Sequence, residues 1–307
     1  MNLVMMTEGT GQGVHGRKTN VSRLYDLLVE NGNQRINLEA GPGTRPFRHL
    51  AGTFFGADAL SIVNHHQNWF LNHAPRPDSR PRGEDASGSA GGGEALKIFL
   101  FGFSRGALIM RVVAEWLAQR GFPVEYMGLW DTVDSTVGIR GEDYVELPTN
   151  VKFARHAVAR DEFRRFFGYL PLCTGNRTIE HAGQSNNVEE LVFPGSHSDV
   201  GGLYDDNHAI ADVTLDWILE PALERGLKIM PEASCRADND RRATTPLISA
   251  ARGEDASDTV YLVHDSLSEP TNGWGAFEPV GRLLDGIRRH SLCGKVSPID
   301  SSRRNGV

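Results

Sequence analysis

Short runs of apolar residues alternate along the chain with longer stretches whose apolar residues recur at helical spacing. The clearest run is 98–101, Ile-Phe-Leu-Phe, and an apolar helical pattern follows it from 107 to 117. Continuous runs of this kind are typical of strands buried on both faces of a parallel sheet. Further strands are predicted at 3–6, 35–38, 124–130, 188–193 and 260–263.

Helices are predicted between these strands, and the first begins after Thr19, a suitable N-cap. The others are predicted at 57–73, 107–117, 152–167 and 206–225. Within 152–167, charges of alternating sign indicate a solvated face, from which Arg155 and His156 are candidates to contact a site. Because strands alternate with helices, the sequence predicts an α/β fold: a mostly parallel sheet with helices on both faces.

The chain of 307 residues is long enough for one large α/β domain, and we expect a single domain over 1–307. The segment 75–94 is rich in Pro, Gly and Ser and lacks apolar periodicity, which predicts a flexible insertion. It is not expected to divide two domains, because the buried strand at 98–101 needs partners from earlier in the chain. A loosely ordered tail is expected from about residue 290.

The overall composition narrows the class of function. The net charge of −7 argues against nucleic acid as a partner and against general attraction to an anionic membrane. The N-terminus lacks the pattern of a signal peptide, and no apolar run approaches the ~18 residues of a transmembrane segment, so synthesis in the cytoplasm is expected. Three widely spaced cysteines fit neither a disulfide framework nor a zinc site: Cys173, Cys235 and Cys293.

The strand at 98–101 runs into Gly102-Phe103-Ser104-Arg105-Gly106, and a helix follows at once. Strand, G-x-S-x-G and helix in this order are the context of a nucleophile elbow. The serine must stand on a tight, strained turn, and glycines on both sides let the strand and the helix close around it. The free N–H groups at the start of the helix then lie where an oxyanion would form.

A second glycine-rich loop follows the first predicted strand. We expect Gly9 and Thr10 in this loop, together with the backbone N–H of Arg105, to form an oxyanion hole. A phosphate-binding loop is the weaker interpretation, because neither G-x-x-x-x-G-K-[ST] nor G-x-G-x-x-G is present. A simple flexible turn remains the alternative without a function.

A serine nucleophile needs an imidazole to accept its proton and a carboxylate to orient that imidazole. In a doubly wound hydrolase the chain order is serine, acid, histidine, each after a strand. Two pairs satisfy this order: Asp131 with His197, or Asp199 with His264. Spacing does not decide between the pairs, and the losing pair would be structural.

Four motifs, FGFSRGA, GLWDTV, RHAVARDEFR and FPGSHSDVGGLY, resemble the serine α/β-hydrolase domain of phospholipase effectors delivered by bacterial type VI secretion systems. TEGTGQ and AGPGT, nearer the N-terminus, are similar to loops of the same family, and the resemblance runs from about residue 3 to about 267. It implies an α/β-hydrolase-like fold. Glu8 departs from the family, which usually has Asp at this place in its first-strand loop.

The resemblance implies Ser104, Asp131 and His197 as catalytic residues, with Asp199 shaping the loop of His197 and His264 in a supporting role. It also implies a phospholipid or other lipid ester as substrate. A component of the secretion apparatus and a cognate immunity protein are the implied partners. Type VI machinery would then deliver the protein into the periplasm of a target cell.

The first hypothesis is therefore a serine esterase of lipids, a phospholipase A, that uses no metal or organic cofactor. His65, His66 and His73 lie together in one predicted helix, but no carboxylate at a supporting spacing points to a metal site. A soluble carboxylesterase or thioesterase for small monomeric substrates is the second hypothesis, favoured by the aromatic content of 8%. The third is a non-catalytic binding module that retains the elbow only for its structure.

Overall fold

The computed structural model describes residues 1–14, 19–44, 54–75, 95–133, 147–164, 167–168, 170–172, 188–230 and 264. The insertion predicted at 75–94 lies outside these residues from 76 onward, and so do the strand predicted at 260–263 and the tail predicted from 290.

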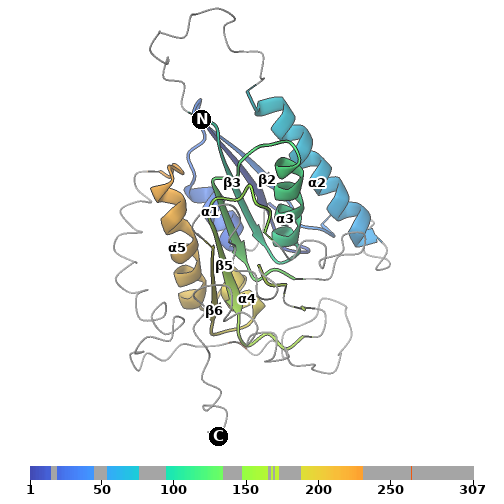
Figure 1. The fold of residues 1–307 in the computed structure, drawn as a ribbon. Helices are drawn as coiled ribbons and strands as arrows, with labels where there is room; N and C mark the ends of the chain where they lie inside the picture. Colours follow the sequence, from blue (N-terminus) through green and yellow to red (C-terminus); the bar gives the residue numbers. More distant parts are fainter. Residues whose placement is uncertain are drawn as a thin grey trace, which may run out of the picture.

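The described strands form one six-stranded parallel sheet with the order β2-β1-β3-β4-β5-β6 (Figure 1). Their bounds are β1 Asn2–Thr7, β2 Gln34–Glu39, β3 Lys97–Phe103, β4 Tyr126–Trp130, β5 Ala154–Ala159 and β6 Val188–Phe193. Strand β1 lies second from one edge of the sheet, with β2 on its outer side and the later described strands in sequence order on its other side. The order therefore reverses between β1 and β3, where ligands bind in open α/β sheets.

Helices cover both faces of the sheet: α1 (Asn20–Leu27), α2 (Phe54–His73), α3 (Arg105–Ala118), α4 (His197–Gly201) and α5 (Ala209–Glu224). Residues of α2 and α3 pack in one apolar cluster with the sheet, and residues of α1 and α5 pack in the other (Figure 1). The α/β class and the helices on both faces are confirmed.

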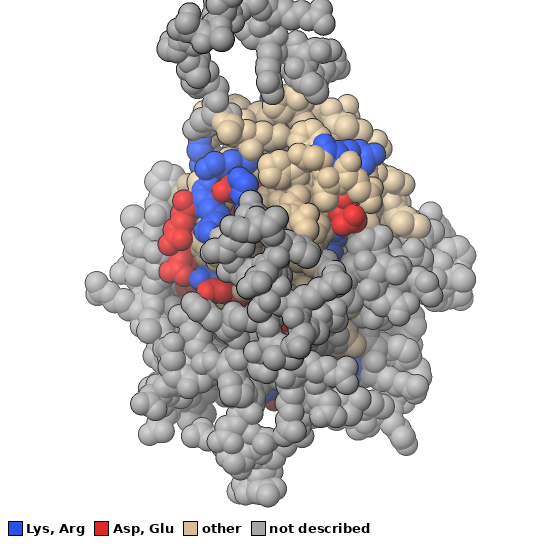
Figure 2. All heavy atoms as spheres, in the orientation of Figure 1, with Lys and Arg blue, Asp and Glu red and all other residues tan. Residues whose placement is uncertain are grey.

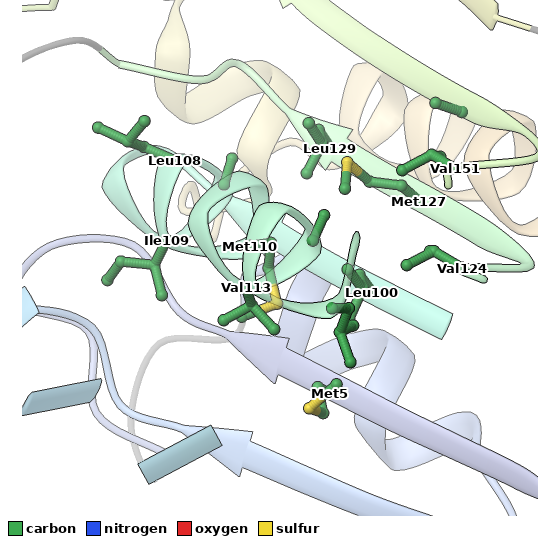
Figure 3. Close-up of a cluster of buried hydrophobic side chains, with 14 of the residues drawn as sticks. Met5, Leu100, Leu108, Ile109, Met110, Val113, Val124, Met127, Leu129 and Val151 are labelled. Carbon is green, nitrogen blue, oxygen red and sulfur yellow. The ribbon is translucent and has the colours of Figure 1, made fainter. Parts of the chain in front are cut away.

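Alternation along the strands explains the two apolar layers, because successive side chains of a strand point to opposite faces. In β1, Leu3 and Met5 join the cluster of α2 and α3, whereas Val4 and Met6 join that of α1 and α5. Figure 3 shows the first layer, in which Met5 and Leu100 lie near Met110 and Val113 of α3. Burying an apolar side chain of this size stabilises the fold by about 1.5–3 kcal/mol.

The helix predicted at 152–167 is wrong, since the segment Ala154–Ala159 forms strand β5 and is buried throughout. Its charged residues have partners on the neighbouring strand instead of a solvated face. Arg155 pairs with Glu189, and His156 pairs with Glu190, in the parallel register of β5 and β6. These cross-strand partners compensate the charges that suggested a surface helix.

The surface carries both signs of charge. In the view of Figure 2, basic and acidic side chains lie close to one another on the described surface, and neither sign covers a broad area. Within the described ranges, no helix has both the length and the apolar composition to cross a membrane.

Candidate active site

Ser104 occupies a sharp left-handed turn between β3 and α3. Its φ of 59° and ψ of −127° are rare for a residue with a side chain, and such strain costs on the order of 1–3 kcal/mol. The turn closes tightly because Gly102 has no side chain: a Cβ there would lie 2.6 Å from the carbonyl oxygen of Gly106. The predicted elbow geometry is therefore present, with Ser104 at the carboxyl end of β3.

Asp131 lies in a second left-handed turn, directly after the neighbouring strand β4, with a φ of 37°. Its backbone N–H donates to the carbonyl of Ala157 at 2.7 Å, and its Oδ1 accepts the N–H of Ala159 at 3.0 Å. The other carboxylate oxygen, Oδ2, lies 2.7 Å from Nδ1 of His197. The strained turn thus aims a fully buried carboxylate at one nitrogen of a histidine ring.

His197 is the first residue of the short helix α4, which opens with a capping box between Ser196 and Asp199. Its ring stacks on Phe103, the residue before Ser104, with the ring centroids 4.4 Å apart. Gly201 makes this packing possible, since a Cβ there would meet the Phe103 ring at 2.2 Å. The fold therefore brings the histidine to the residue that adjoins the elbow.

Burial lowers the pKa of His197 below its ordinary value, although the hydrogen bond to Asp131 acts in the opposite direction. The ring is accordingly neutral near pH 7, with the Nδ1 proton on the side of Asp131. Neither Nε2 of His197 nor Oγ of Ser104 has a hydrogen-bond partner among the described residues. Catalytic hydrogen bonds often form fully only when the substrate binds.

The second candidate pair is also in contact. Nδ1 of His264 lies 2.6 Å from Oδ1 of Asp199, and its Nε2 lies 3.2 Å from Asp206. Burial lowers the pKa of His264, but its hydrogen bonds to the carboxylates of Asp199 and Asp206 prevail and raise that pKa. Both ring nitrogens are thus engaged with carboxylates, whereas His197 has Nε2 available.

The loop after β1 lies against the elbow. A Cβ on Gly9 would meet the Cβ of Ser104 at 3.4 Å, and the guanidinium of Arg105 donates to the Thr10 hydroxyl at 2.8 Å. A second loop supports the first, since a Cβ on Gly41 would lie only 1.7 Å from the carbonyl oxygen of Gly9. The three residues predicted for the oxyanion hole, Gly9, Thr10 and Arg105, are therefore close to Ser104.

Glu8, the residue that departs from the resembled family, is fully buried at the end of β1. Its Oε2 accepts the hydroxyl of Thr19, the N-cap of α1, at 2.6 Å, while Oε1 has no partner in the described part of the chain. Burial raises the pKa of Glu8 to about 7, despite the hydrogen bonds that lower it. The longer side chain thus reaches the start of α1 and bridges two elements beside the site.

Sequence reasoning missed Glu162, which is fully buried and accepts the backbone N–H of His197 at 3.2 Å. Glu162 also forms an ion pair with Arg164 at 2.8 Å. The charges of alternating sign around residue 160 predict a solvated face, so the sequence gives no signal for this contact.

The three histidines of α2 have separate environments. Buried His66 contacts the Thr7 hydroxyl at 2.7 Å and Asn37 at 3.0 Å, and burial lowers its pKa to about 3. His65 is near Glu39 and His73 contacts the Trp69 carbonyl. Among the described residues, no group of three or more His, Cys, Asp or Glu side chains could hold a metal ion.

The fold and the geometry together define the class of protein. A parallel sheet between two helical layers, a serine on a left-handed elbow, and a histidine–aspartate pair after later strands are features of α/β hydrolases. The family model for the T6SS phospholipase effector Tle1-like catalytic domain matches residues 1–123 and 116–221. The chain belongs to this family, which confirms the resemblance noted from its motifs.

Solved structures are similar to the chain at low sequence identity. An uncharacterized protein from Pseudomonas aeruginosa is 15% identical with a TM-score of 0.55, over 84% of this chain and 51% of that chain. This chain therefore spans about half the length of the Pseudomonas aeruginosa protein. The Tle1 effector bound to the VgrG spike of the type VI secretion system is 14% identical with a TM-score of 0.46, over 84% and 81%. Est1E from Butyrivibrio proteoclasticus is 15% identical with a TM-score of 0.39, over 73% and 87%.

A search of curated proteins found no significant match to the chain.

Proposed function

We propose that the protein is a serine esterase that hydrolyses carboxylic esters of phospholipids, as a phospholipase A. The observation that carries this proposal is the 2.7 Å contact between Asp131 and His197, whose ring stacks beside the Ser104 elbow. Membership of a phospholipase effector family supports the lipid substrate.

In the proposed mechanism, Oγ of Ser104 attacks the acyl carbonyl while Nε2 of His197 takes the hydroxyl proton. The carbonyl oxygen becomes an oxyanion, which accepts hydrogen bonds from the backbone N–H of Arg105 and from the Gly9–Thr10 loop. Each such donor is typically worth about 3 kcal/mol in the barrier. The tetrahedral intermediate then expels the lipid alcohol, which receives the proton from His197.

Water completes the proposed cycle. His197 removes a proton from the water as it attacks the acyl-enzyme, and the proton returns to Ser104 when the fatty acid leaves. Asp131 keeps the Nδ1 proton in place and stabilises the imidazolium that forms in each half. The Asp199–His264 pair would support the loop of His197 through the cap of α4.

The proposal is tested by labelling the purified protein with a fluorophosphonate and measuring fatty-acid release from phospholipid vesicles. Wild-type protein should be labelled at Ser104 and should release fatty acid, and Ser104→Ala should do neither. If Ser104→Ala keeps wild-type hydrolysis, the proposed nucleophile is wrong. A Ser104→Ala protein that melts like the wild type serves as the control for folding.

The low aromatic content favours a second candidate, a carboxylesterase or thioesterase for small monomeric esters. Vesicle hydrolysis compared with hydrolysis of a short-chain p-nitrophenyl ester separates the two functions. Rapid turnover of the short ester without vesicle hydrolysis would favour the second candidate.

Delivery by a type VI secretion apparatus into the periplasm of a target cell is part of the proposal, because the family is one of type VI effectors. A spike component and an immunity protein would then be the protein partners. Co-purification of the full protein with a spike protein from the producing cell tests the first of these.

A further inference from the structure

A second buried histidine–carboxylate pair lies beside the proposed triad. His156 on β5 and Glu190 on β6 are register partners, with Nδ1 of the histidine 2.8 Å from Oε2 of the glutamate. Their exposed fractions are 0% and 4%. The same Oε2 accepts the backbone N–H of Leu172 at 2.9 Å, so Glu190 is held in place from two sides. The proposed mechanism gives neither side chain a role.

The other side of the His156 ring faces the turn that carries Asp131. The backbone N–H of Thr132 donates to Nε2 of His156 at 3.0 Å, and the Thr132 hydroxyl lies 3.1 Å from the same atom. Because Nε2 accepts a backbone N–H, the ring proton must be on Nδ1, where it donates to Glu190. Burial lowers the pKa of His156, which agrees with a neutral ring.

This contact acts on a strained part of the backbone. Asp131, with its φ of 37°, immediately precedes Thr132. The Thr132 carbonyl accepts the N–H of Leu170, and Arg111 donates to the Leu170 carbonyl at 2.9 Å and to the Thr132 hydroxyl at 3.5 Å. Strained turns persist only where their surroundings determine them fully. Glu190 and Thr132 contact the His156 ring, and the charges of Arg111 and Asp131 also act on its pKa.

We propose that His156, oriented by Glu190, is a positioning residue that holds the Asp131 turn so that its carboxylate meets His197. The inference rests on the proposed serine esterase function, since it assigns how the acid of that site is aimed. Glu190 fixes the ring, the ring fixes the N–H of Thr132, and that N–H fixes the turn. A displacement of about 1 Å at such a site can cost about 100-fold in rate.

The same two strands offer a matched control. One register position earlier, Arg155 pairs with Glu189 at 2.8 Å, and its guanidinium also contacts the Trp217 carbonyl and Glu220 of α5. This pair therefore faces the opposite side of the sheet from His156. Glu189→Gln weakens an ion pair between β5 and β6 without touching the turn of Asp131.

The test compares His156→Leu, His156→Gln and Glu189→Gln with the wild type in kcat, KM and the pH profile of short-ester hydrolysis. His156→Leu should lower kcat by about 10- to 100-fold with KM nearly unchanged. The acidic limb of kcat/KM should move to lower pH, because the hydrogen bond to Asp131 normally raises the pKa of His197. His156→Gln, whose amide oxygen can accept the Thr132 N–H, should lose less, and Glu189→Gln should match the wild type.

A folded His156→Leu protein with wild-type kcat and an unshifted pH profile would overturn the inference. Where His156→Leu does not fold, a folded Glu190→Leu protein with wild-type kcat and an unshifted pH profile overturns the inference equally, because Leu cannot accept the His156 Nδ1–H that orients the ring. A purely structural role would lower the melting temperature without moving the acidic limb.

Failure of the proposed function has a different signature: the wild type would hydrolyse no ester and take no fluorophosphonate label. The inference is then decided by NMR on the same variants. The downfield resonance of the His197 Nδ1 proton should move in His156→Leu, relative to the wild type, and should stay unchanged in Glu189→Gln. An unchanged resonance in His156→Leu would show that His156 does not position Asp131.

Discussion

Replacing Glu8 by Gln should make the protein more resistant to unfolding at alkaline pH than at acidic pH, relative to the wild type. Burial raises the pKa of Glu8 from 4.5 to about 7. Between these two values the folded state keeps a proton that the unfolded state releases, so the contribution of Glu8 to stability falls as the pH rises. Above about pH 7 the buried carboxylate is charged and its full cost is present.

The magnitude follows from the size of the pKa change. A difference of about 2.5 pH units at 1.36 kcal/mol per unit gives about 3 kcal/mol between the two ends of this window. The Gln amide oxygen can still accept the Thr19 hydroxyl, so the hydrogen bond to the N-cap of α1 is kept. Any constant cost of burying the amide NH2 cancels when the same variant is compared at two pH values.

Urea unfolding of the wild type and of Glu8→Gln at about pH 5 and about pH 8.5 measures this difference. The variant should gain about 2.5 kcal/mol relative to the wild type between the two conditions, because pH 5 already lies slightly above the ordinary pKa of the carboxyl group. Glu224→Gln is the matched control, because the Glu224 side chain is 70% exposed. Equal pH dependence in Glu8→Gln and the wild type would refute the argument that burial holds Glu8 protonated.

Three further predictions concern the proposed site. Asp131→Asn should lower kcat of ester hydrolysis by roughly 10³- to 10⁴-fold, because the neutral amide no longer keeps the His197 proton on Nδ1. A melting temperature like that of the wild type shows that the variant is folded. Gly41→Ala should lower kcat by about 100-fold, because its Cβ would displace the Gly9 carbonyl, while Gly32→Ala, with open space around it, should leave kcat unchanged. The acidic limb of kcat/KM should lie below pH 6.5, because burial lowers the pKa of His197 and the ring stays neutral into weakly acidic solution. An acidic limb above pH 6.5 would contradict this prediction.

The elbow could be predicted from the sequence because everything it needs is local. Strand, glycine, serine, glycine and helix follow one another within 97–118, and the close contact of Gly102 with Gly106 lies within the same turn. The place of Gly9 beside the elbow is not local in this sense, because it depends on β1 and β3 being neighbours in the sheet, and its role in an oxyanion hole stays a prediction.

The choice between the two acid–base pairs could not be made from the residues alone, because both pairs exist as contacts. What separates them is the second nitrogen of each ring. His264 uses it for Asp206, and His197 does not use it for any described residue. That difference depends on a contact between two residues 58 positions apart in the chain, which no local pattern encodes.

The sequence predicts a helix where β5 lies, and this error also comes from contacts between residues far apart in the chain. Periodicity arguments take a charged residue as a sign of solvent, but Arg155 and His156 are compensated by partners that lie 34 positions later in the chain. The helix prediction therefore missed how His156 and Glu162 contact residues of the site. The charge pattern assigns Glu162 to a solvated face and offers His156 only as a candidate to contact a site from that face, although both residues are fully buried.

The two residues with positive φ other than glycine in the described chain are Ser104 and Asp131, and the backbone joins them. The N–H of Ser104 donates to the carbonyl of Trp130, directly before Asp131, and the N–H of Val133 donates back to the carbonyl of Ser104. Strain in the two turns is therefore shared across one pair of parallel strands. Each turn constrains the other, so a change that relaxes the acid turn should also disturb the elbow.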